Sequence, residues 1–511
     1  MRPLGVFLVL AGLCASCTSP RPPVDLVLEN VRVVDGTGAR AFLGHVVVDA
    51  GVIVAVDDGR ETRRDARERI DGEGLVLAPG FVDTHSHHDR GLQRQPEALA
   101  AVGQGVTTIV VGQDGGSERP LSALFSRLES SPVAVNVASY SGHNSLRFEV
   151  LGENYTREAT ADEIDSMAEL LQADLDAGAL GLATGLEYDP GIYSSTSEVM
   201  RLAEVAAAAG GRYISHMRSE DRDLENALDE LLEIGRTTGI PVQISHFKLA
   251  RKGLWGSAGE FLAKLDQARA EGVKVTADVY PYEYWQSTMT VLFPERVYDR
   301  KAATYALEEL APPEGIRLTA FAPEPNLVGR TLSEIAKERN QDAVTTYLEL
   351  IETAQSYSGD QLPIESILGT SMSTEDIEAL LRWPHTNLCT DGGLRDRHPR
   401  GIASYPRVFG RYVRERGVLS LEEAVHKSTL LAARHVGIEG RGQLVAGDAA
   451  DLVLFDPDLI LDLATPLDPW QLSAGIVGVW VNGTRVFDEG ESTGARPGQV
   501  LRRQNSKETL R

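Results

Sequence analysis

Short runs of alternating apolar and polar residues occupy the first part of the chain, from residue 24 to residue 70. Alternation with a period of two is typical of antiparallel strands. The same pattern returns near the C-terminus, in ADLVLFD (450–456) and IVGVWVNGTRVF (476–487). The two ends therefore predict one small β-sandwich domain assembled from residues 24–75 and 436–500.

Between these ends, apolar runs that finish in a polar residue alternate with helix-like stretches. The residues that end the eight runs are His85, Asp114, His143, Glu187, His216, His246, Tyr282 and Asp391. Five of the seven intervals between them are 29 to 36 residues long, as expected for one βα unit each. The interval before Glu187 is 44 residues, and the last, of 109 residues, must hold an insertion at about 283–382 that could form a lid.

Near-continuous apolar strands that alternate with helices predict an α/β fold with a parallel sheet buried on both faces. Eight such strands favour a (β/α)8 barrel of the TIM type over residues 76–435. An open, doubly wound sheet is the structural alternative. It does not explain why reactive residues stand at the ends of so many different strands, where barrel active sites form.

The composition and net charge of the chain limit the kinds of molecule that it is expected to bind. The chain has 511 residues, of which 42% are hydrophobic, and its formal net charge is −24. Such a chain repels nucleic acid and anionic membrane surfaces, so it predicts a small-molecule partner and no nucleic acid. An acidic substrate would have to be held by a few local cations. The sequence favours no particular oligomeric state.

Residues 1–17 predict an export signal. Arg2 precedes an apolar stretch, residues 6–13, that is too short to span a bilayer as a mature helix. Ala15 and Ser16 then precede Cys17, which resembles a bacterial lipoprotein signal with Cys17 as the acylated first residue. The alternative is cleavage by ordinary signal peptidase, which gives a soluble periplasmic protein. Once the signal is removed and Cys17 is acylated, Cys389 is the one thiol left, so no disulfide is available.

Histidines at the run ends predict a metal site. His85 and His87 stand two residues apart, so both point to the same face of an extended strand end and can chelate zinc. His216, His246 and Asp391 end three further runs. Each histidine alone could be a core residue, but four histidines and two carboxylates at corresponding strand ends predict one or two divalent ions, with Zn2+ as the expected metal.

This ligand set resembles that of the amidohydrolase superfamily, which has HxH on strand one, histidine on strands five and six, and aspartate on strand eight. Within it, the chain is similar to the D-aminoacylase (N-acyl-D-amino-acid deacylase) family. The similar stretches are PGFVDTHSHHD, GVTTIVVG, GHNSLR, GALGLATGLEYDPG, ISHMRSE, ISHFK, DVYPY, HPRGIASYPRVFGRYVRE and RGQLVAGDAADLVLFDP. The resemblance covers nearly the whole mature chain and implies metal-dependent hydrolysis of linear amides.

The chain departs from the family pattern at two strand ends. Family members often carry cysteine after strand two, in GNCG, where this chain has GQDG with Asp114. Asp114 is therefore expected to orient a histidine or to replace the cysteine as a ligand. Many superfamily members bridge two metals with a carboxylated lysine on strand four, where this chain has Glu187, the expected bridging ligand. The resemblance makes Asp391 both a ligand and the proton shuttle between water and the departing amine.

The resemblance also implies a set of substrate contacts. Lys248 stands two residues beyond the histidine of strand six and projects to the same side of the strand. By resemblance, the α-carboxylate is gripped by Lys248, Arg400, Tyr282 and Ser287, and His143 lies beside the reacting amide. The implied substrates are N-acyl-D-amino acids or L-Xaa-D-Xaa dipeptides.

Two other functions stay open as alternatives. A cyclic-amide hydrolase, similar to hydantoinases or dihydroorotases, would share the barrel and the ligands. The absence of a lysine at the end of strand four and the YPY and HPRG stretches count against it. A catalytically inactive barrel that serves as an envelope scaffold would have lost ligands, whereas this chain keeps every one.

Acylation of Cys17 can be tested by cell fractionation. A lipid anchor holds a protein on the membrane through buried methylenes. Cys17→Ser should therefore move the protein from the membrane fraction to the soluble periplasm, whereas Cys14→Ser should leave it at the membrane. An unchanged distribution of Cys17→Ser would contradict acylation. The remaining explanations would be ordinary secretion or retention of the signal.

Overall fold

The computed structural model describes residues 22–59 and 61–504. The predicted export signal, including Cys17, lies outside these described residues. Within the described ranges, no helix combines the length and the apolar character that crossing a membrane requires.

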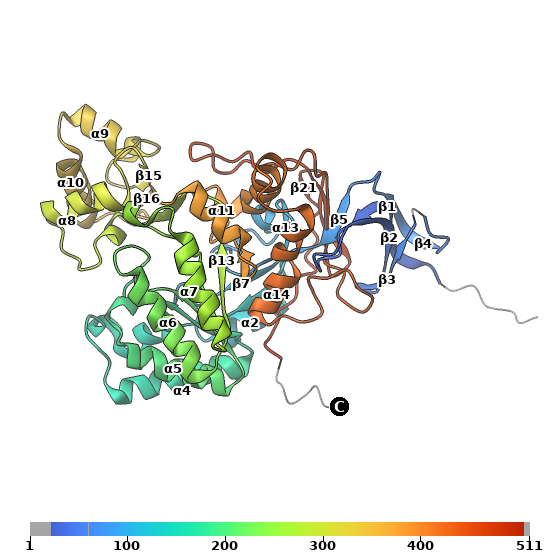
Figure 1. Cartoon of the computed structure of the whole chain (residues 1–511), viewed down its shortest axis with the longest axis horizontal. Coiled ribbons are helices and arrows are strands. Elements are labelled where there is room, and N and C mark those ends of the chain that lie inside the picture. The colour runs from blue at the N-terminus through green and yellow to red at the C-terminus, as the bar shows by residue number, and fades with distance from the viewer. Residues whose placement is uncertain (1–21, 60, 505–511) are drawn as a thin grey trace, which may run out of the picture.

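One nine-stranded sheet draws its strands from both ends of the chain and lies at one end of the molecule (Figure 1). Its strands are β1 (Val24–Val33), β2 (Phe42–Asp49), β3 (Val52–Asp58), β4 (Ala66–Asp71), β5 (Val76–Pro79), β18 (Leu452–Phe455), β19 (Ile476–Val481), β20 (Thr484–Asp488) and β21 (Glu491–Ser492). Antiparallel pairing of β5 with β18 joins the N-terminal strands to the C-terminal ones. The antiparallel prediction is confirmed for the pairing of β1 with β2 and is wrong for its pairing with β4 and β5, which is parallel. Alternation predicts strands but not their direction, because side chains alternate in both.

Parallel strands run through the middle of the chain in two sheets. The first contains β6 (Phe81–Asp83), β7 (Val106–Val111) and β8 (Asn136–Ser139). The second contains β9 (Ser141–Gly142), β10 (Gly181–Gly185), β11 (Arg212–His216), β12 (Val242–Ile244), β13 (Val275–Val279) and β17 (Thr386–Leu388). Tyr140 alone separates β8 from β9 along the chain. On the other side, the residues after β17 bond to those after β6, with Asp391 N donating to His85 O at 2.8 Å and His87 N donating to Gly392 O at 2.9 Å.

Helices follow the parallel strands along the chain. They are α1 (Leu99–Val102), α2 (Leu121–Ser130), α3 (His143–Leu151), α4 (Ala161–Ala177), α5 (Thr196–Ala208), α6 (Leu224–Thr238), α7 (Ala258–Ala270), α11 (Thr374–Arg382), α12 (Arg400–Arg407), α13 (Leu421–Ser428) and α14 (Leu430–Val436). α4 begins at a capping box in which Thr160 and Glu163 satisfy each other's backbone N–H groups. α6 buries Leu224, Leu228 and Leu231, which are spaced to share one face.

The long interval before β17 holds a separate unit, here called the lid (residues 284–370). It contains an antiparallel sheet of β14 (Tyr284–Ser287), β16 (Glu365–Thr370) and β15 (Ile316–Phe321), with α8 (Arg300–Tyr305), α9 (Leu332–Arg339) and α10 (Ala343–Gln355). The lid has its own apolar core, which includes Leu318, Leu332 and Tyr347. In Figure 1 it stands beyond α7, away from the nine-stranded sheet. A core of its own lets the lid fold as a unit within the insertion.

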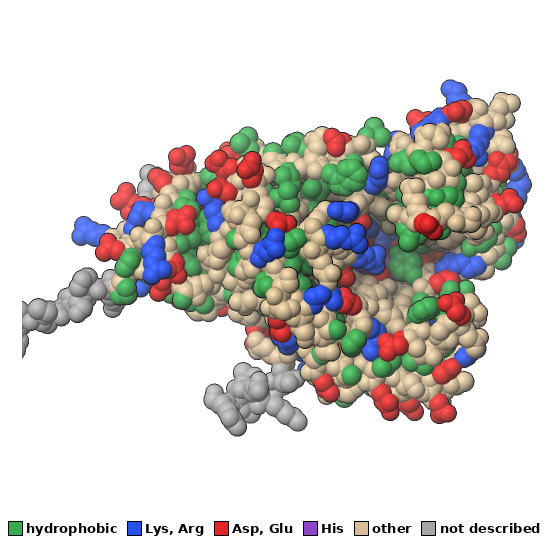
Figure 2. Space-filling view, turned by 180° about the vertical axis from the view of Figure 1, so that it is seen from behind, with side chains coloured by type: hydrophobic (Ala, Val, Ile, Leu, Met, Phe, Trp, Pro, Cys, Tyr) green, Lys and Arg blue, Asp and Glu red, His purple; other side chains and the backbone are tan. Residues whose placement is uncertain are grey.

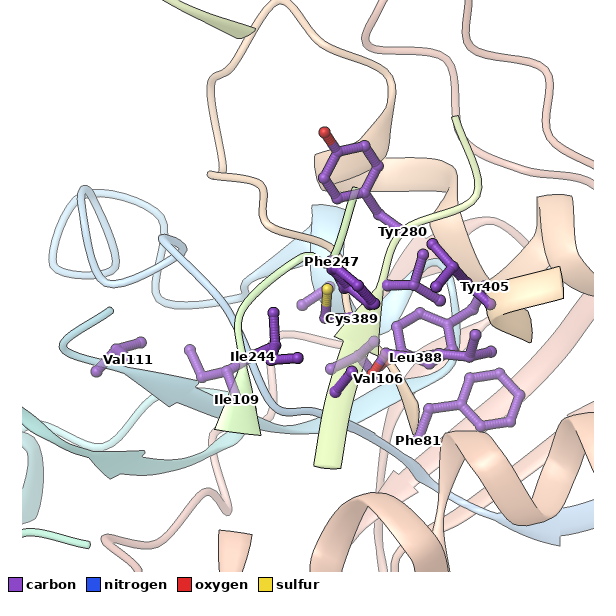
Figure 3. Close-up of a cluster of buried hydrophobic side chains, with 14 of the residues drawn as sticks. Phe81, Val106, Ile109, Val111, Ile244, Phe247, Tyr280, Leu388, Cys389 and Tyr405 are labelled. Carbon is purple, nitrogen blue, oxygen red and sulfur yellow. The ribbon is translucent and has the colours of Figure 1, made fainter. Parts of the chain in front are cut away.

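Aromatic side chains connect the parallel strands to the nine-stranded sheet. Phe81 of β6 is fully buried and stacks on Tyr405 and Phe409, with ring centroids 5.1 and 5.3 Å apart. Its ring centroid is also 6.4 Å from that of Phe455, which belongs to β18. Figure 3 shows Phe81 and Tyr405 in the apolar cluster below the strand ends.

Truncation of Phe81 should therefore destabilise the whole molecule. Phe81→Ala removes stacked contacts from a fully buried position, at an expected cost of about 3–5 kcal/mol. Thermal melting should show a clearly lower Tm for Phe81→Ala than for wild type. Phe148→Ala is the matched control, because that ring is 48% exposed. Equal melting of the two variants would contradict the role given to the aromatic cluster.

Candidate metal centre

The carboxyl ends of the parallel strands carry the candidate ligands. His85 and His87 follow β6, Asp114 follows β7, His216 ends β11, His246 follows β12 and Asp391 follows β17. Because parallel strands end at the same edge, these residues converge. The ring centroids of His216 and His246 are 4.7 Å apart, and those of His85 and His246 are 4.8 Å apart.

Three overlapping groups could each hold a metal ion, since their ligand atoms lie within 4.8 Å of one another. The first group is His85, His87, Asp114 and Asp391; the second is Asp114, His216 and His246; the third is Glu187, His216 and Glu220. Asp114 belongs to the first two groups. It is therefore placed to bridge two ions.

The Asp114 carboxylate lies among all four histidines. One of its oxygens is 3.3 Å from His85 Nε2, 3.3 Å from His246 Nε2 and 4.0 Å from His216 Nδ1. The other is 3.2 Å from His87 Nε2. The backbone of Asp114 is left-handed, with a φ of 53°, a conformation that aspartate adopts more readily than most residues. Of the two predicted roles of Asp114, replacement ligand and orienting acceptor, the geometry favours the ligand.

Glu187, predicted as the bridging ligand, lies at one end of the cluster. Its carboxylate contacts His216 Nε2 at 2.9 Å, and it belongs only to the third group. None of the three groups joins Glu187 to His85 or His87. Asp114 belongs to two of the groups, so the geometry favours Asp114 over Glu187 as the bridge.

The chemistry of the donor set fits zinc. His85 is fully buried, and neither of its ring nitrogens has a hydrogen-bond partner among the described residues. A buried polar group without a partner is costly unless something else binds it. Imidazole nitrogens and carboxylate oxygens are ligands that zinc takes in catalytic sites. The residues present thus fit two divalent ions that share Asp114.

Two of the histidines lie in a field that favours positive charge. Burial opposes the imidazolium form of His87, but the carboxylates of Asp114 and Asp391 outweigh it and raise the pKa to about 9. Burial and Lys248 both oppose charging of His246, yet the surrounding carboxylates raise its pKa to about 10. Bound metal requires neutral imidazoles, so metal ions would take the place of these protons.

Asp391 connects the first group to the cavity above it. One carboxylate oxygen lies 3.5 Å from His85 Nε2 and 3.4 Å from His87 Nε2. The other accepts a hydrogen bond from Arg400 Nη1 at 2.5 Å. Burial favours the neutral acid, but Arg400 and the histidines outweigh burial and hold the pKa of Asp391 well below its usual range. Asp391 is therefore ionised at neutral pH, while Arg400 is already ion-paired.

Lys248 lies beside the second group and is also paired. Its Nζ donates to both carboxylate oxygens of Glu220 at 2.7 Å and lies 2.7 Å from His246 Nδ1. Burial would raise the pKa of Glu220, but Lys248 and the histidines lower it below its usual range. Glu220 was not predicted from the sequence, although it stands four residues after His216, in ISHMRSE.

Two predicted substrate-binding residues are not brought to the cavity. His143 begins α3, and its Nε2 lies 2.8 Å from a carboxylate oxygen of Glu198 in α5. Tyr282 is fully buried, with the guanidinium of Arg407 at 4.4 Å from its ring centroid. Neither side chain lines the cavity. The substrate contacts of His143 and Tyr282 therefore stay predictions that the cavity lining does not support.

Asn144 takes the place of His143 at the cavity, whereas Tyr280 lies next to two cations that line the cavity without lining it itself. Asn144, directly after His143, lines the cavity. Tyr280, directly after β13, is fully buried, and its hydroxyl has no hydrogen-bond partner among the described residues. Its ring centroid lies 4.8 Å from the Arg400 guanidinium and 5.8 Å from Lys248 Nζ. Figure 3 shows the hydroxyl directed away from the apolar cluster. The YPY stretch contains two tyrosines, so the sequence already offered Tyr280 as an alternative to Tyr282.

Buried acids beneath the ligands hold the strand ends in place. Asp278 of β13 accepts hydrogen bonds from His246 N at 2.5 Å and from Gln243 Nε2 at 2.6 Å. Asp83 of β6 accepts from Thr390 N at 2.9 Å and from its hydroxyl at 2.5 Å. Each acid ties one strand end to a neighbouring one. The ligands after β12 and β17 are thereby oriented by bonds to their own backbone.

A cavity of about 560 Å3 lies over the ligands. Asp114, His246 and Asp391 contribute to its floor, and Trp285 and Ser287 line it from the lid. Ser287 is thus at the cavity, as predicted. In Figure 2 the surface is hollowed between the lid and the rest of the molecule. Size, concavity and convergent polar groups are typical of small-molecule sites.

The sequence profile of the amidohydrolase family matches residues 68–487, a range that includes every ligand described above. The chain belongs to this family. The parallel strands and the histidine and carboxylate ligands at their ends all lie within the range that matches the family.

The chain is similar to several deacylases of N-acyl-D-amino acids. An N-acyl-D-glutamate deacylase of Alcaligenes xylosoxydans xylosoxydans is 35% identical over 507 residues, which cover 94% of this chain and 97% of the relative. A D-aminoacylase of the same organism is 36% identical, over 95% and 99% of the two chains. The crystal structure of an N-acyl-D-glutamate deacylase from Bordetella bronchiseptica, complexed with zinc and a phosphonate mimic of the tetrahedral intermediate, aligns with a TM-score of 0.84. It is 34% identical and covers 94% of this chain and 100% of that one. These matches confirm the predicted family resemblance.

The bridging role of Asp114 predicts metal contents that differ between variants. Wild type should bind about two divalent ions per chain, and Asp114→Ala should lose most of both, because the two groups share that carboxylate. Glu187→Ala should keep the ions of the first two groups. Asp221→Asn, in the same cavity but in none of the groups, is the control. Elemental analysis showing two ions in Asp114→Ala and loss in Glu187→Ala would restore Glu187 as the bridge.

Proposed function

We propose that this protein hydrolyses the amide bond of N-acyl-D-amino acids, or of L-Xaa-D-Xaa dipeptides, with zinc held by the strand-end ligands. The observation that carries the proposal is the Asp114 carboxylate, shared by two histidine groups at the floor of a cavity that also contains Lys248. The alignment with an N-acyl-D-glutamate deacylase and a D-aminoacylase over nearly their full lengths supports the same reaction class.

We infer that the parallel strands close into a (β/α)8 barrel around this centre. Support comes from the single residue between β8 and β9 and from the backbone bonds that link the ends of β17 and β6. Closure would surround the ligands with eight strand ends, as in enzymes of this architecture.

Bound zinc supplies a water of lowered pKa and polarises the scissile carbonyl. Proton transfer is carried out by a side chain of the protein. Asp391 accepts the proton of the attacking water and passes it to the leaving nitrogen, since its carboxylate is ionised and faces the cavity. Arg400 holds one oxygen of that carboxylate, so the other stays directed at the reacting atoms.

Lys248 and Tyr280 are placed to bind the carboxylate of the amino acid. Lys248 lines the cavity, and the Tyr280 hydroxyl is buried without an acceptor among the described residues. Ser287 lies on the lid side of the same cavity. With the carbonyl at the metal ligands and the carboxylate at Lys248, inversion of the α-carbon turns the side chain toward a different wall. Two fixed contacts therefore favour one enantiomer.

We also propose that the enzyme acts in the cell envelope. Support comes from residues 1–17, whose pattern is that of an export signal ending at Cys17. The mature protein is then either anchored by its acylated Cys17 or released into the periplasm.

Kinetics with matched enantiomers test the proposed reaction. Wild type should hydrolyse N-acetyl-D-methionine and reject the L-form. Lys248→Met should lower kcat/KM about ten- to a hundred-fold, the effect of losing about 1.5–3 kcal/mol from one charge-assisted contact, while the metals stay bound. Lys274→Met, an exposed site, is the control. Asp391→Asn should nearly abolish turnover.

Two results would contradict the proposal. One is equal rates on the D- and L-forms. The other is robust hydrolysis of a hydantoin without any hydrolysis of N-acyl-D-amino acids, which would favour the cyclic-amide alternative.

A further inference from the structure

The cavity is rich in carboxylates and poor in unpaired cations. Its lining carboxylates are Asp114, Glu187, Asp189, Glu220, Asp221, Glu365, Asp391 and Asp396. The lining Lys and Arg residues are Arg90, Lys248 and Arg400, and the last two are ion-paired with Glu220 and Asp391. Metal ions would offset the negative charge of the carboxylates nearest the histidines. The rest of the cavity lining would still carry a net negative charge.

Glu365 is the lining carboxylate that belongs to the lid. It begins β16, and both of its oxygens accept from Met289 N, at 3.0 and 2.8 Å. No Lys or Arg of the described residues forms an ion pair with it, and the apolar residues Val291 and Leu310 line the same cavity. Burial raises the pKa of Glu365 to about 7, because the single backbone donor compensates only part of the desolvation.

We propose that Glu365 binds a basic side chain of the D-amino acid, an ammonium or guanidinium group. The inference rests on the proposed function and names its substrate class. A carboxylate in an apolar wall holds a guanidinium through two charge-assisted hydrogen bonds. The apolar residues that line the same cavity, such as Val291, suit the methylenes that carry such a cation.

The lid leaves room for a long side chain. A second cavity, of about 700 Å3, adjoins the first and shares with it Tyr188, Asp189, Thr288, Val291, Pro363 and Glu365. Apolar residues such as Ile351 and Ile364 line its further wall. Glu365 belongs to the boundary between the two cavities. A side chain that extends from the metal ligands toward the second cavity therefore passes its carboxylate.

Arg90 is the feature that would favour an acidic substrate instead. It forms no side-chain ion pair among the described residues and lines the cavity. Its side chain is exposed, however, so water and salt screen its charge. Glu365 is half-buried, and an interaction with it is screened less. We therefore expect N-acyl-D-glutamate to be a poor substrate, in contrast to the deacylases named above.

A pair of substrates with the same shape tests the charge directly. N-acetyl-D-arginine and N-acetyl-D-citrulline differ chiefly in the positive charge at the end of the side chain. Wild type should prefer the arginine derivative about ten- to a hundred-fold in kcat/KM, and Glu365→Gln should bring that ratio close to one. Hydrolysis of N-acetyl-D-methionine by Glu365→Gln should stay within about two-fold of wild type, which also reports that the variant folds. Glu352→Gln changes an exposed lid carboxylate and should keep the wild-type ratio.

Each contrary result shows whether the role of Glu365 or the proposed function is wrong. Equal rates on the arginine and citrulline derivatives in wild type, or a preference that survives in Glu365→Gln, would overturn the role of Glu365. Faster hydrolysis of N-acetyl-D-glutamate than of N-acetyl-D-arginine would overturn it in favour of Arg90. If the folded, zinc-loaded protein hydrolyses none of these compounds, the proposed function fails and the inference fails with it.

Discussion

Burying several ionisable side chains around one point is stable only when each of them has a partner. Here the Asp114 carboxylate lies within 4.0 Å of all four imidazoles, which come from strands far apart in the sequence, and bound metal ions would complete the pairing of His85. The arrangement depends on parallel strands that all end at one edge. It also depends on Asp83 and Asp278 beneath that edge, which fix neighbouring strand ends to each other. The ligand positions are therefore set by the packed strands more than by the loops that follow them.

The lid adds the specific part of the cavity without disturbing these strands. Its core is separate, and the Tyr347 hydroxyl donates to Met289 O at 2.8 Å inside it. The same Met289 gives its N–H to Glu365. The side chain that faces the substrate is thus held by the lid's own packing. Changes in the lid can alter which side chain is accepted while the ligands stay in place.

The ligand strands could be predicted because a buried parallel strand is a continuous apolar run, and its carboxyl end is where the run meets polar residues. The four histidines and Asp391 were found in this way. The choice between Asp114 and Glu187 as the bridge could not be made in this way, because it requires knowing which side chains converge across the site. The orientation of a side chain could not be predicted for the same kind of reason. His143 and Asn144 are adjacent, and only the packing of α3 decides that Asn144 lines the cavity and His143 does not.

The ion pairs of the two buried cations show how the cavity tolerates its charges. Lys248 and Arg400 each hold a carboxylate, so neither is left buried and unpaired when substrate is absent. An incoming carboxylate joins an existing ion pair and does not neutralise a free charge. Its net stabilisation is therefore smaller than that of a new pair, and the unpartnered Tyr280 hydroxyl becomes correspondingly more important for holding it. Arg400 also holds Asp391, the base of the proposed mechanism. Substrate that drew the guanidinium away would therefore raise the pKa of Asp391 just as that mechanism requires it to accept a proton.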